Sequence, residues 1–409
     1  MTSVQNKVAA PIAEADRIEI LDILRGFALF GILIMNIINF SGYDFASDAT
    51  KSSFSTYRID QHLLNLARMF FEGKFYAIFS ILFGIGFSII MMRLKSKTSN
   101  WKALFYRRLL ILALIGYIHL QFLWAGDILL VYALMGFLLP LFANYTDRNL
   151  LIVSVSLLVL AIVIHVFVAI TGFMPGQWLE NIGLMIDSRN GIPEDESWRT
   201  YLFNSAHGWQ EFWKWNVPGP LFRFSDLINS NRFFKILSLF LLGYYIGRRQ
   251  FALYLEADRL IIKKITIYGF LMGIPSNLAY VYFYNDGIQL PEPLGLLDSV
   301  FQIVGGFSLG LAIMGGLTIA YFNGHKWLMW FAPMGKMALT NYLMQTIICI
   351  GLFYCIAFAL GGKMGLTYIY LITVGIILFQ MLYSKVWLKY YRYGPMEWLW
   401  RKLTYGRLK

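Results

Sequence analysis

The stretch that decides the fold is ILRGFALFGILIMNIINF, residues 23–40. Arg25, Asn36 and Asn39 are the polar side chains in an otherwise apolar run. About 20 consecutive apolar residues in a helix span the hydrocarbon core of a bilayer. We therefore expect a membrane-spanning helix here. Because no small-residue cleavage site follows the run, we expect the helix to be retained and not removed as a signal peptide.

The rest of the chain repeats this pattern. Of its 409 residues, 58% are hydrophobic and 14% are charged, which leaves too little polar surface for a soluble globule. Further apolar runs occupy residues 70–92, 104–124, 128–142, 150–173, 233–246, 261–283, 296–322, 337–360 and 367–388. The sequence therefore predicts an all-α protein, a polytopic bundle of about ten transmembrane helices.

Lysine and arginine cluster at alternate ends of the apolar runs. Residues 93–108, 248–264 and 385–409 are rich in these bases, whereas residues 285–295 carry Asp286 and Glu292 and no base. Loops rich in Lys and Arg stay in the cytoplasm. We therefore expect both termini on the cytoplasmic side, and we expect the protein to be a multi-pass protein of the bacterial cytoplasmic (inner) membrane.

This topology divides the chain into five parts. They are a cytoplasmic tail (1–20), a first five-helix half (21–173), an external loop (174–231), a second five-helix half (232–388) and a cytoplasmic amphipathic segment (389–409). The external loop is too long for a plain tether, so we expect it to have structure of its own. Its aromatic stretch 198–215 is expected to lie at the membrane interface. The alternative is that this stretch covers an external pocket.

The formal net charge of +12 comes from bases at the ends of the apolar runs, as membrane topology requires. Nucleic acid is therefore not an expected partner, whereas membrane lipids are. Cys349 and Cys355 share one apolar run and are expected to be packing residues. We predict no metal site, and the sequence leaves a homodimer open.

Two apolar runs place an arginine and a second polar side chain on one helix face. Arg25 precedes Asn36 by eleven residues, and Arg108 precedes His119 by the same interval. Eleven residues are close to three helical turns, or about 16 Å along the axis. Polar groups are costly in lipid, so these faces are expected to contact other helices.

His119 and Asp127 are the candidate catalytic pair. A tight turn follows His119, and Asp127 opens the next apolar run eight residues later. Antiparallel packing would bring the two together, and a carboxylate beside an imidazole orients it for work as a general base. The alternative is that Asp127 only caps a helix and His119 only bonds two helices.

Three further polar residues are candidates for lining a cavity. Asn341 and Gln345 share one helix face at positions i and i+4, and Asn36 lies in the first run. Lys74 is expected at the outer mouth of the second run. It is either a snorkelling anchor or a contact for an external substrate, and the sequence leaves both roles open.

Five short motifs, taken together, resemble the signature of the YeiB family of bacterial membrane proteins. They span nearly the whole chain: LDILRGFA (21–28) with Gly31 and Asn36; GKF (73–75) with FSILFGIGF (79–87); His119 with GDIL (126–129) and Tyr132; LTNY (339–342) with Gln345; and GPMEWLWR (394–401).

This resemblance implies membership of the transmembrane acyltransferase superfamily, which includes heparan-alpha-glucosaminide N-acetyltransferase. The implied reaction moves an acyl group from cytoplasmic acyl-CoA to an acceptor hydroxyl or amine at the outer face. Arg25, Arg107 and Arg108 would then hold the CoA phosphates. His119 would act as the base, with Asp127 holding its ring. The alternative role of Arg107 and Arg108 is topology determination alone.

Two other classes of function stay open. A transporter or exporter of a small metabolite would use the polar residues Asn36, Asn277, Asn341 and Gln345. However, the apolar runs lack a deep acidic residue for cation coupling and show no paired repeat. A scaffold would leave His119 and the arginines with roles in packing and topology only.

Overall fold

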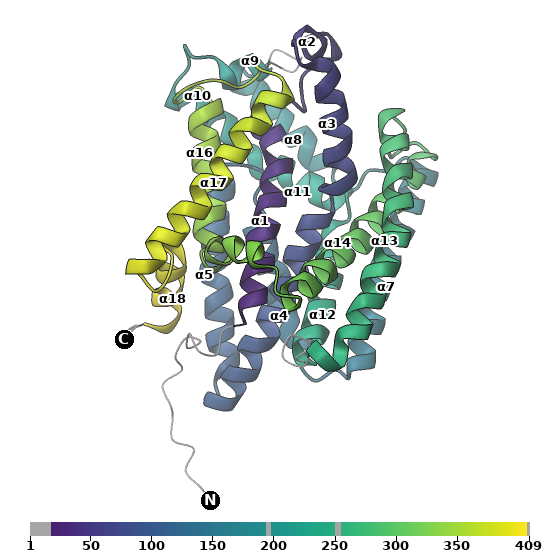
Figure 1. The fold of residues 1–409 in the computed structure, drawn as a ribbon. Coiled ribbons are helices and arrows are strands. Elements are labelled where there is room, and N and C mark those ends of the chain that lie inside the picture. The colour runs from purple at the N-terminus through teal and green to yellow at the C-terminus, as the bar shows by residue number, and fades with distance from the viewer. Residues whose placement is uncertain (1–17, 194–197, 250–254, 407–409) are drawn as a thin grey trace, which may run out of the picture.

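The computed structural model describes residues 18–193, 198–249 and 255–406, and each regular element within these ranges is a helix (Figure 1). The predicted tail 1–20 and the end of the predicted segment 389–409 lie partly outside them. In chain order the elements are α1 (Glu19–Phe40), α2 (Asp48–Ser53), α3 (Tyr57–Phe70), α4 (Lys74–Lys97), α5 (Trp101–Phe122), α6 (Leu129–Leu138), η2 (Leu139–Phe142), α7 (Asp147–Thr171), α8 (Gln177–Arg189), α9 (Trp198–Phe203), α10 (Trp209–Asn216), α11 (Gly219–Asn229), α12 (Arg232–Arg248), α13 (Leu255–Asn285), α14 (Gly295–Phe322), η3 (Lys326–Trp330), α15 (Phe331–Lys336), α16 (Ala338–Phe353), α17 (Leu366–Tyr390) and α18 (Pro395–Tyr405).

Each of the ten predicted apolar runs contains a helix, so the all-α fold is confirmed. Within the described ranges, six helical stretches are long and apolar enough to cross a membrane: α1, α3–α4 taken together, α5, α7, α14 and α17. A seventh results if the pair formed by residues 326–336 and α16, bent by 80°, is counted as one span. The count of ten spans and the sidedness of the termini stay predictions.

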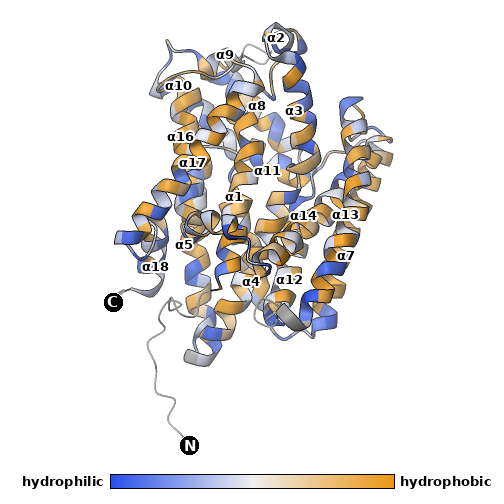
Figure 2. Cartoon of the chain, in the orientation of Figure 1, coloured by the Kyte–Doolittle hydropathy of each residue, from blue (hydrophilic) through white to orange (hydrophobic). Residues whose placement is uncertain are grey.

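The sides of the bundle are apolar. Val155 on α7, Leu271 on α13 and Leu371 on α17 are between 58% and 65% exposed. Hydrophobic residues cover the length of the helices, and hydrophilic residues gather toward the two ends (Figure 2). Each large apolar side chain left in water costs roughly 1.5–3 kcal/mol relative to burial. Together with the helix lengths, this surface identifies a multi-pass membrane protein.

Helix α1 lies inside the bundle, and α7 lies at its edge. In the most hydrophobic window of α1, 61% of the residues are buried, compared with 22% for α7. Leu29, Leu33 and Ile37 are completely buried in the largest apolar core, together with residues of α16 and α17. An interior position for α1 explains why polar groups such as Arg25 are tolerated in it, since they face protein and not lipid.

Glycine permits a close contact between α4 and α12. Gly84 of α4 packs against the backbone of α12 at Phe240 and Gly243, and Gly247 packs against α4 at Ile85 and Ser88. A side chain at Gly84 would collide with the Phe240 carbonyl oxygen. Small residues allow such approach between helices in a membrane. Later residues of α4 contact later residues of α12, so the two helices run parallel.

The predicted external loop has structure of its own, as expected. It forms α8 to α11, of which α10 and α11 contact α5. The aromatic stretch 198–215 is divided between two short helices, with Phe212 buried and Trp209 and Trp213 exposed. Its interfacial position stays a prediction.

Candidate functional site

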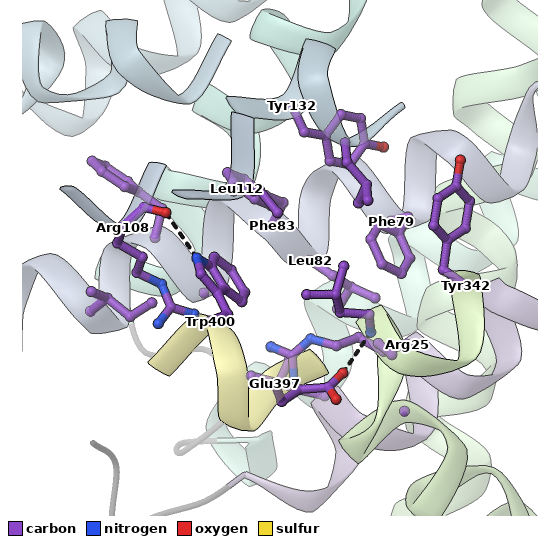
Figure 3. Close-up of a pocket in the computed structure, with 18 of the residues that line it drawn as sticks. Arg25, Phe79, Leu82, Phe83, Arg108, Leu112, Tyr132, Tyr342, Glu397 and Trp400 are labelled. Carbon is purple, nitrogen blue, oxygen red and sulfur yellow. Dashed lines mark hydrogen bonds between the residues drawn. The ribbon is translucent and has the colours of Figure 1, made fainter. Parts of the chain in front are cut away.

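A cavity of about 260 Å³ opens between α1, α4, α5, α6, α16 and α18. Phe79, Leu82, Phe83 and Leu112 form much of its apolar wall. Arg25, Arg108, Glu397 and Trp400 lie toward one end of the view in Figure 3, and Tyr132 and Tyr342 lie toward the other. The cavity is therefore amphiphilic.

The charged lining is mostly cationic. Within the part of the chain that the structure describes, four basic side chains, Arg25, Arg108, Lys336 and Arg401, share the lining with one carboxylate, Glu397. Because Arg107 is exposed and outside the lining, only two of the three predicted CoA-binding arginines reach the cavity. Successive helix residues are about 100° apart around the axis, so Arg107 and Arg108 point in different directions.

Two aromatic and ionic contacts orient these arginines. Arg25 Nη1 donates to Asp22 Oδ1 at 2.8 Å. The guanidinium carbon of Arg108 lies 3.7 Å from the ring centroid of Trp400, whose Nε1 donates to the Arg108 carbonyl oxygen at 2.8 Å. Stacking on an aromatic ring fixes the orientation of the planar guanidinium group. Both positively charged groups are therefore held in place at the cavity wall.

Glu397 fixes α18 against α16. Its carboxylate accepts hydrogen bonds from the backbone N–H groups of Leu339 (2.7 Å) and Thr340 (3.1 Å) and from the Thr340 hydroxyl (2.6 Å). A carboxylate at a helix N-terminus satisfies free N–H groups and complements the helix dipole. Burial raises the pKa of this carboxyl against the lowering effect of the Thr340 hydrogen bonds. The C-terminal segment therefore forms a wall of the cavity in addition to its predicted place at the interface.

His119 and Asp127 meet, as predicted. His119 Nδ1 lies 2.8 Å from Asp127 Oδ2, and both residues are 1% exposed. Asp127 Oδ1 also accepts a hydrogen bond from Leu130 N–H at 2.8 Å, at the start of α6. The two interpretations of Asp127 hold at the same time, since one oxygen caps the helix and the other contacts the imidazole. The catalytic role of the pair stays a prediction.

The second ring nitrogen of His119 also has a partner. Its Nε2 lies 2.9 Å from the hydroxyl oxygen of Thr346 on α16. Asp127, His119 and Thr346 thus form a chain of carboxylate, imidazole and hydroxyl, the order found in serine-type triads. Nothing in the sequence pointed to Thr346, because its contact with His119 joins residues 227 positions apart.

His119 lies behind the cavity wall. It is absent from the lining, whereas Tyr342 lines the cavity and its ring centroid lies 5.3 Å from that of His119. Arg108 and His119 were predicted to share one helix face, but only Arg108 lines the cavity. The ring of Tyr342 lies between the cavity and His119.

The three predicted cavity-lining residues lie outside this cavity. Asn341 donates to Ser384 Oγ at 2.9 Å, and Gln345 donates to Gln380 Oε1 at 3.0 Å, which ties α16 to α17. Asn36 is half-buried. In the interior of a membrane bundle such amides gain more from interhelical bonds than from facing lipid, so Asn341 and Gln345 act here as helix-packing groups.

Lys74 is enclosed, in contrast to its predicted place at an open outer mouth. It is 1% exposed, and its Nζ donates to the Arg68 carbonyl oxygen at 2.8 Å. The side chain is neither a snorkelling anchor nor an exposed contact for a substrate, because the packed α3–α4 corner covers it.

Comparison with known proteins shows relatives along the whole chain. Residues 246–407 match the family described as "Protein of unknown function (DUF418)". The "Uncharacterized protein YxaH" of Bacillus subtilis (strain 168) is 31% identical over 416 residues, which cover 97% of this chain and 96% of YxaH. The "Uncharacterized protein YeiB" of Escherichia coli (strain K12) is 28% identical over 94% of this chain and 95% of YeiB.

No solved structure matches the chain. A 39.9 kDa protein of Bacillus acidopullulyticus, encoded in the amylase 3' region, is 27% identical over 97% of this chain and 96% of its own length. The full-length identity with YxaH and YeiB and the DUF418 match agree with the five sequence motifs. The chain therefore belongs to the YeiB-like family of DUF418 membrane proteins.

Proposed function

We propose that this chain is a transmembrane acyltransferase that takes an acyl-CoA donor into the cavity and transfers its acyl group to a hydroxyl or amine of an acceptor at the outer face. The observation that supports this best is the amphiphilic cavity, with basic side chains at one end and an apolar depth. The motifs resemble the YeiB family, and the membership of the transmembrane acyltransferase superfamily that this resemblance implies also supports the proposal.

The donor fits by charge and polarity. Phosphate groups of CoA would pair with Arg25, Arg108 and Arg401, since guanidinium groups bind phosphate oxygens through paired N–H donors. The acyl chain would lie among Phe79, Leu82 and Phe83, which remove apolar surface from water. Tyr342, at the inner end, would lie beside the thioester.

The chemistry assigns one step to His119. The acceptor oxygen or nitrogen attacks the thioester carbonyl carbon, a C–O or C–N bond forms, and the C–S bond breaks. His119 Nε2 removes the acceptor proton and returns it to the departing CoA sulfur. Asp127 at Nδ1 holds the ring and stabilises the imidazolium formed on the way.

Two local movements bring the reactants together. The Tyr342 ring must turn aside, because it separates the cavity from the His119 ring. The acceptor must also take the position of the Thr346 hydroxyl at Nε2, or Thr346 must pass the proton on. Coupling these movements to donor binding would keep the thioester away from water until an acceptor is present.

The proposed orientation follows the basic residues. The cavity mouth, near the start of α1 and the basic segments at the ends of α4 and α12, would face the cytoplasm, where acyl-CoA is made. Ten spans and the bacterial inner membrane belong to this proposal.

Binding of acyl-CoA to the purified protein tests the proposal. We expect acetyl-CoA or longer acyl-CoAs to bind the wild type, and Arg25→Ala and Arg108→Ala each to weaken binding about tenfold, the equivalent of one charge-assisted contact. Arg107→Ala is the matched control, since its side chain is exposed and outside the lining. Equal binding by all four proteins would contradict the donor site.

Transport is the alternative function. Absence of binding for every acyl-CoA, combined with flux of a small metabolite across liposomes that contain the protein, would favour a transporter.

A further inference from the structure

A second group of basic side chains lies where α11 and α12 meet α7. Arg223 Nη1 pairs with Asp226 Oδ2 at 3.0 Å, and Arg232 Nη1 lies 3.8 Å from the same oxygen. Lys235 is within electrostatic range of both Arg232 and Asp226. Asp226 is the one carboxylate within ion-pair distance of these cations among the described residues, and Glu72 acts on Arg232 from further away. Positive charge is therefore in excess.

The innermost side chains of this group are almost completely buried, and the ring nitrogens of His165 have no hydrogen-bond partner among the described residues. Lys235 is 4% exposed, and its ammonium interacts electrostatically with Arg232 and Asp226. His165 of α7, which is close enough to interact electrostatically with Lys235, is also 4% exposed, and neither of its ring nitrogens has a hydrogen-bond partner. Buried polar groups are normally satisfied, and a buried charge without a partner is costly. An anion would satisfy both side chains.

The group lies far from the basic end of the cavity. Gly86 of α4 faces Arg25, and the parallel contact of α4 with α12 places Gly86 level with residue 245. Lys235 and Arg232 precede that position by ten and thirteen residues, which is about 15–20 Å along the helix axis. The two cationic sites therefore occupy different levels of the bundle.

Arg223 links the group to the catalytic pair. Its Nε donates to the Asp127 carbonyl oxygen at 2.9 Å, while its Nη1 bonds to Asp226. The outer rim is open, since the side chains of Asp226 and Arg232 are 48% and 30% exposed. Arg223 therefore connects this group directly to the backbone of Asp127.

We propose that Arg223, Arg232, Lys235 and His165 form a second anion-binding site, which takes a phosphate group distinct from that of any cytoplasmic donor. A phosphate offers several acceptor oxygens to guanidinium, ammonium and imidazole donors at once. This assignment rests on the proposed acyl transfer: in that reaction the site holds the acceptor substrate, which is a molecule that carries a phosphate group. The site itself does not depend on acyl transfer.

Calorimetric titration of the detergent-purified full chain tests the site. The probes are inorganic phosphate, a short-chain phosphatidylglycerol and, as the probe without net charge, a phosphatidylcholine of the same chain length. We expect the wild type to bind the anionic lipid, and Lys235→Gln and Arg232→Gln to weaken binding about tenfold. Lys264→Gln, an exposed lysine on α13, is the matched control.

Each outcome is informative. Binding of both phosphate and the anionic lipid identifies a site for a free anion, and binding of the lipid alone identifies a site for a headgroup. Equal affinity in wild type, Lys235→Gln and Lys264→Gln, or no binding by folded wild type, would overturn the proposal. Melting curves of each variant show that it is folded. The donor titration is separate, so loss of acyl-CoA binding with retained anion binding would refute the acyltransferase and leave this site standing.

Discussion

His119 Nδ1 lies 2.8 Å from Asp127 Oδ2, and both side chains are buried. The other oxygen of Asp127 accepts a hydrogen bond from Leu130 N–H in the first turn of α6. One carboxylate thus connects the end of α5 to the beginning of α6 and sets the orientation of the imidazole. Stability and the proposed chemistry depend on the same residue, and substitutions separate the two.

Asp127→Ala should lower the free energy of unfolding by roughly 2–4 kcal/mol, because it removes a helix cap and leaves Nδ1 of the buried His119 imidazole without a partner. Asp127→Asn keeps an oxygen for Leu130 and should cost less. Thermal unfolding in one detergent compares the two. Equal melting temperatures for Asp127→Ala and wild type would show that neither contact contributes.

His119→Ala should reduce acyl transfer by about 10²–10⁴-fold, the usual contribution of a general base. Binding of acyl-CoA should not change, because His119 lies outside the cavity lining. Transfer of a labelled acyl group to membrane acceptors measures the catalytic activity. Equilibrium titration measures the binding of acyl-CoA. Full transfer activity in the variant would remove His119 from the mechanism.

Glu397→Ala should release α18 from α16, because three donors of α16 lose their acceptor. We expect faster hydrogen–deuterium exchange across residues 395–405 and roughly tenfold weaker binding of acyl-CoA, since Trp400 and Arg401 line the cavity from this helix. Lys402→Ala, an exposed position on α18, is the control. Unchanged exchange would mean that other contacts hold the helix.

Gly84→Ala should destabilise the protein by about 1–3 kcal/mol, because the added methyl group meets the backbone of α12. Gly375→Ala on α17 has open space around it and should be neutral or stabilising by up to about 1 kcal/mol through higher helix propensity. The melting temperature of Gly84→Ala should fall below that of the wild type, whereas that of Gly375→Ala should be unchanged or higher. Equal effects would contradict the tight α4–α12 contact.

The short helices α8 to α11 should respond to pH through Asp187 of α8. Burial raises its pKa from 3.8 to about 6. The folded state therefore binds the proton more tightly than the unfolded state, so the contribution of Asp187 to stability is fully present below about pH 4 and is lost as the pH rises to about 6. Asp187→Asn should flatten the melting temperature over this interval. A wild-type profile identical to that of the variant would exclude the effect.

The helices themselves were predictable from the sequence. The apolar runs located each long helix, because hydrophobic segments of this length satisfy their backbone only as helices in lipid. The meeting of His119 and Asp127 was also predictable, since eight residues and a tight turn separate them. Local spacing leaves few alternatives to that contact.

Contacts between distant segments were not predictable. Thr346, which contacts His119, is 227 positions away, and Arg223, which contacts Asp127, is 96 positions away. Asn341 and Gln345 had the right spacing to line a cavity, yet their amides bond to α17. The spacing of polar residues predicts which face of a helix is polar. It does not predict which other helix that face contacts.

The sequence by itself determined that this is an all-helical membrane protein of the YeiB-like family and that His119 can reach Asp127, because hydrophobic length and short-range spacing act along the chain. Only the tertiary structure decided that α18 forms a cavity wall with Arg25 and Arg108 and that Tyr342 lies between this cavity and His119. It also decided that Lys235 and His165 are both buried and that the ring nitrogens of His165 lack a hydrogen-bond partner among the described residues. The physical reason is that helices in a membrane pack through side-chain shape and interhelical hydrogen bonds, and these depend on which helices become neighbours.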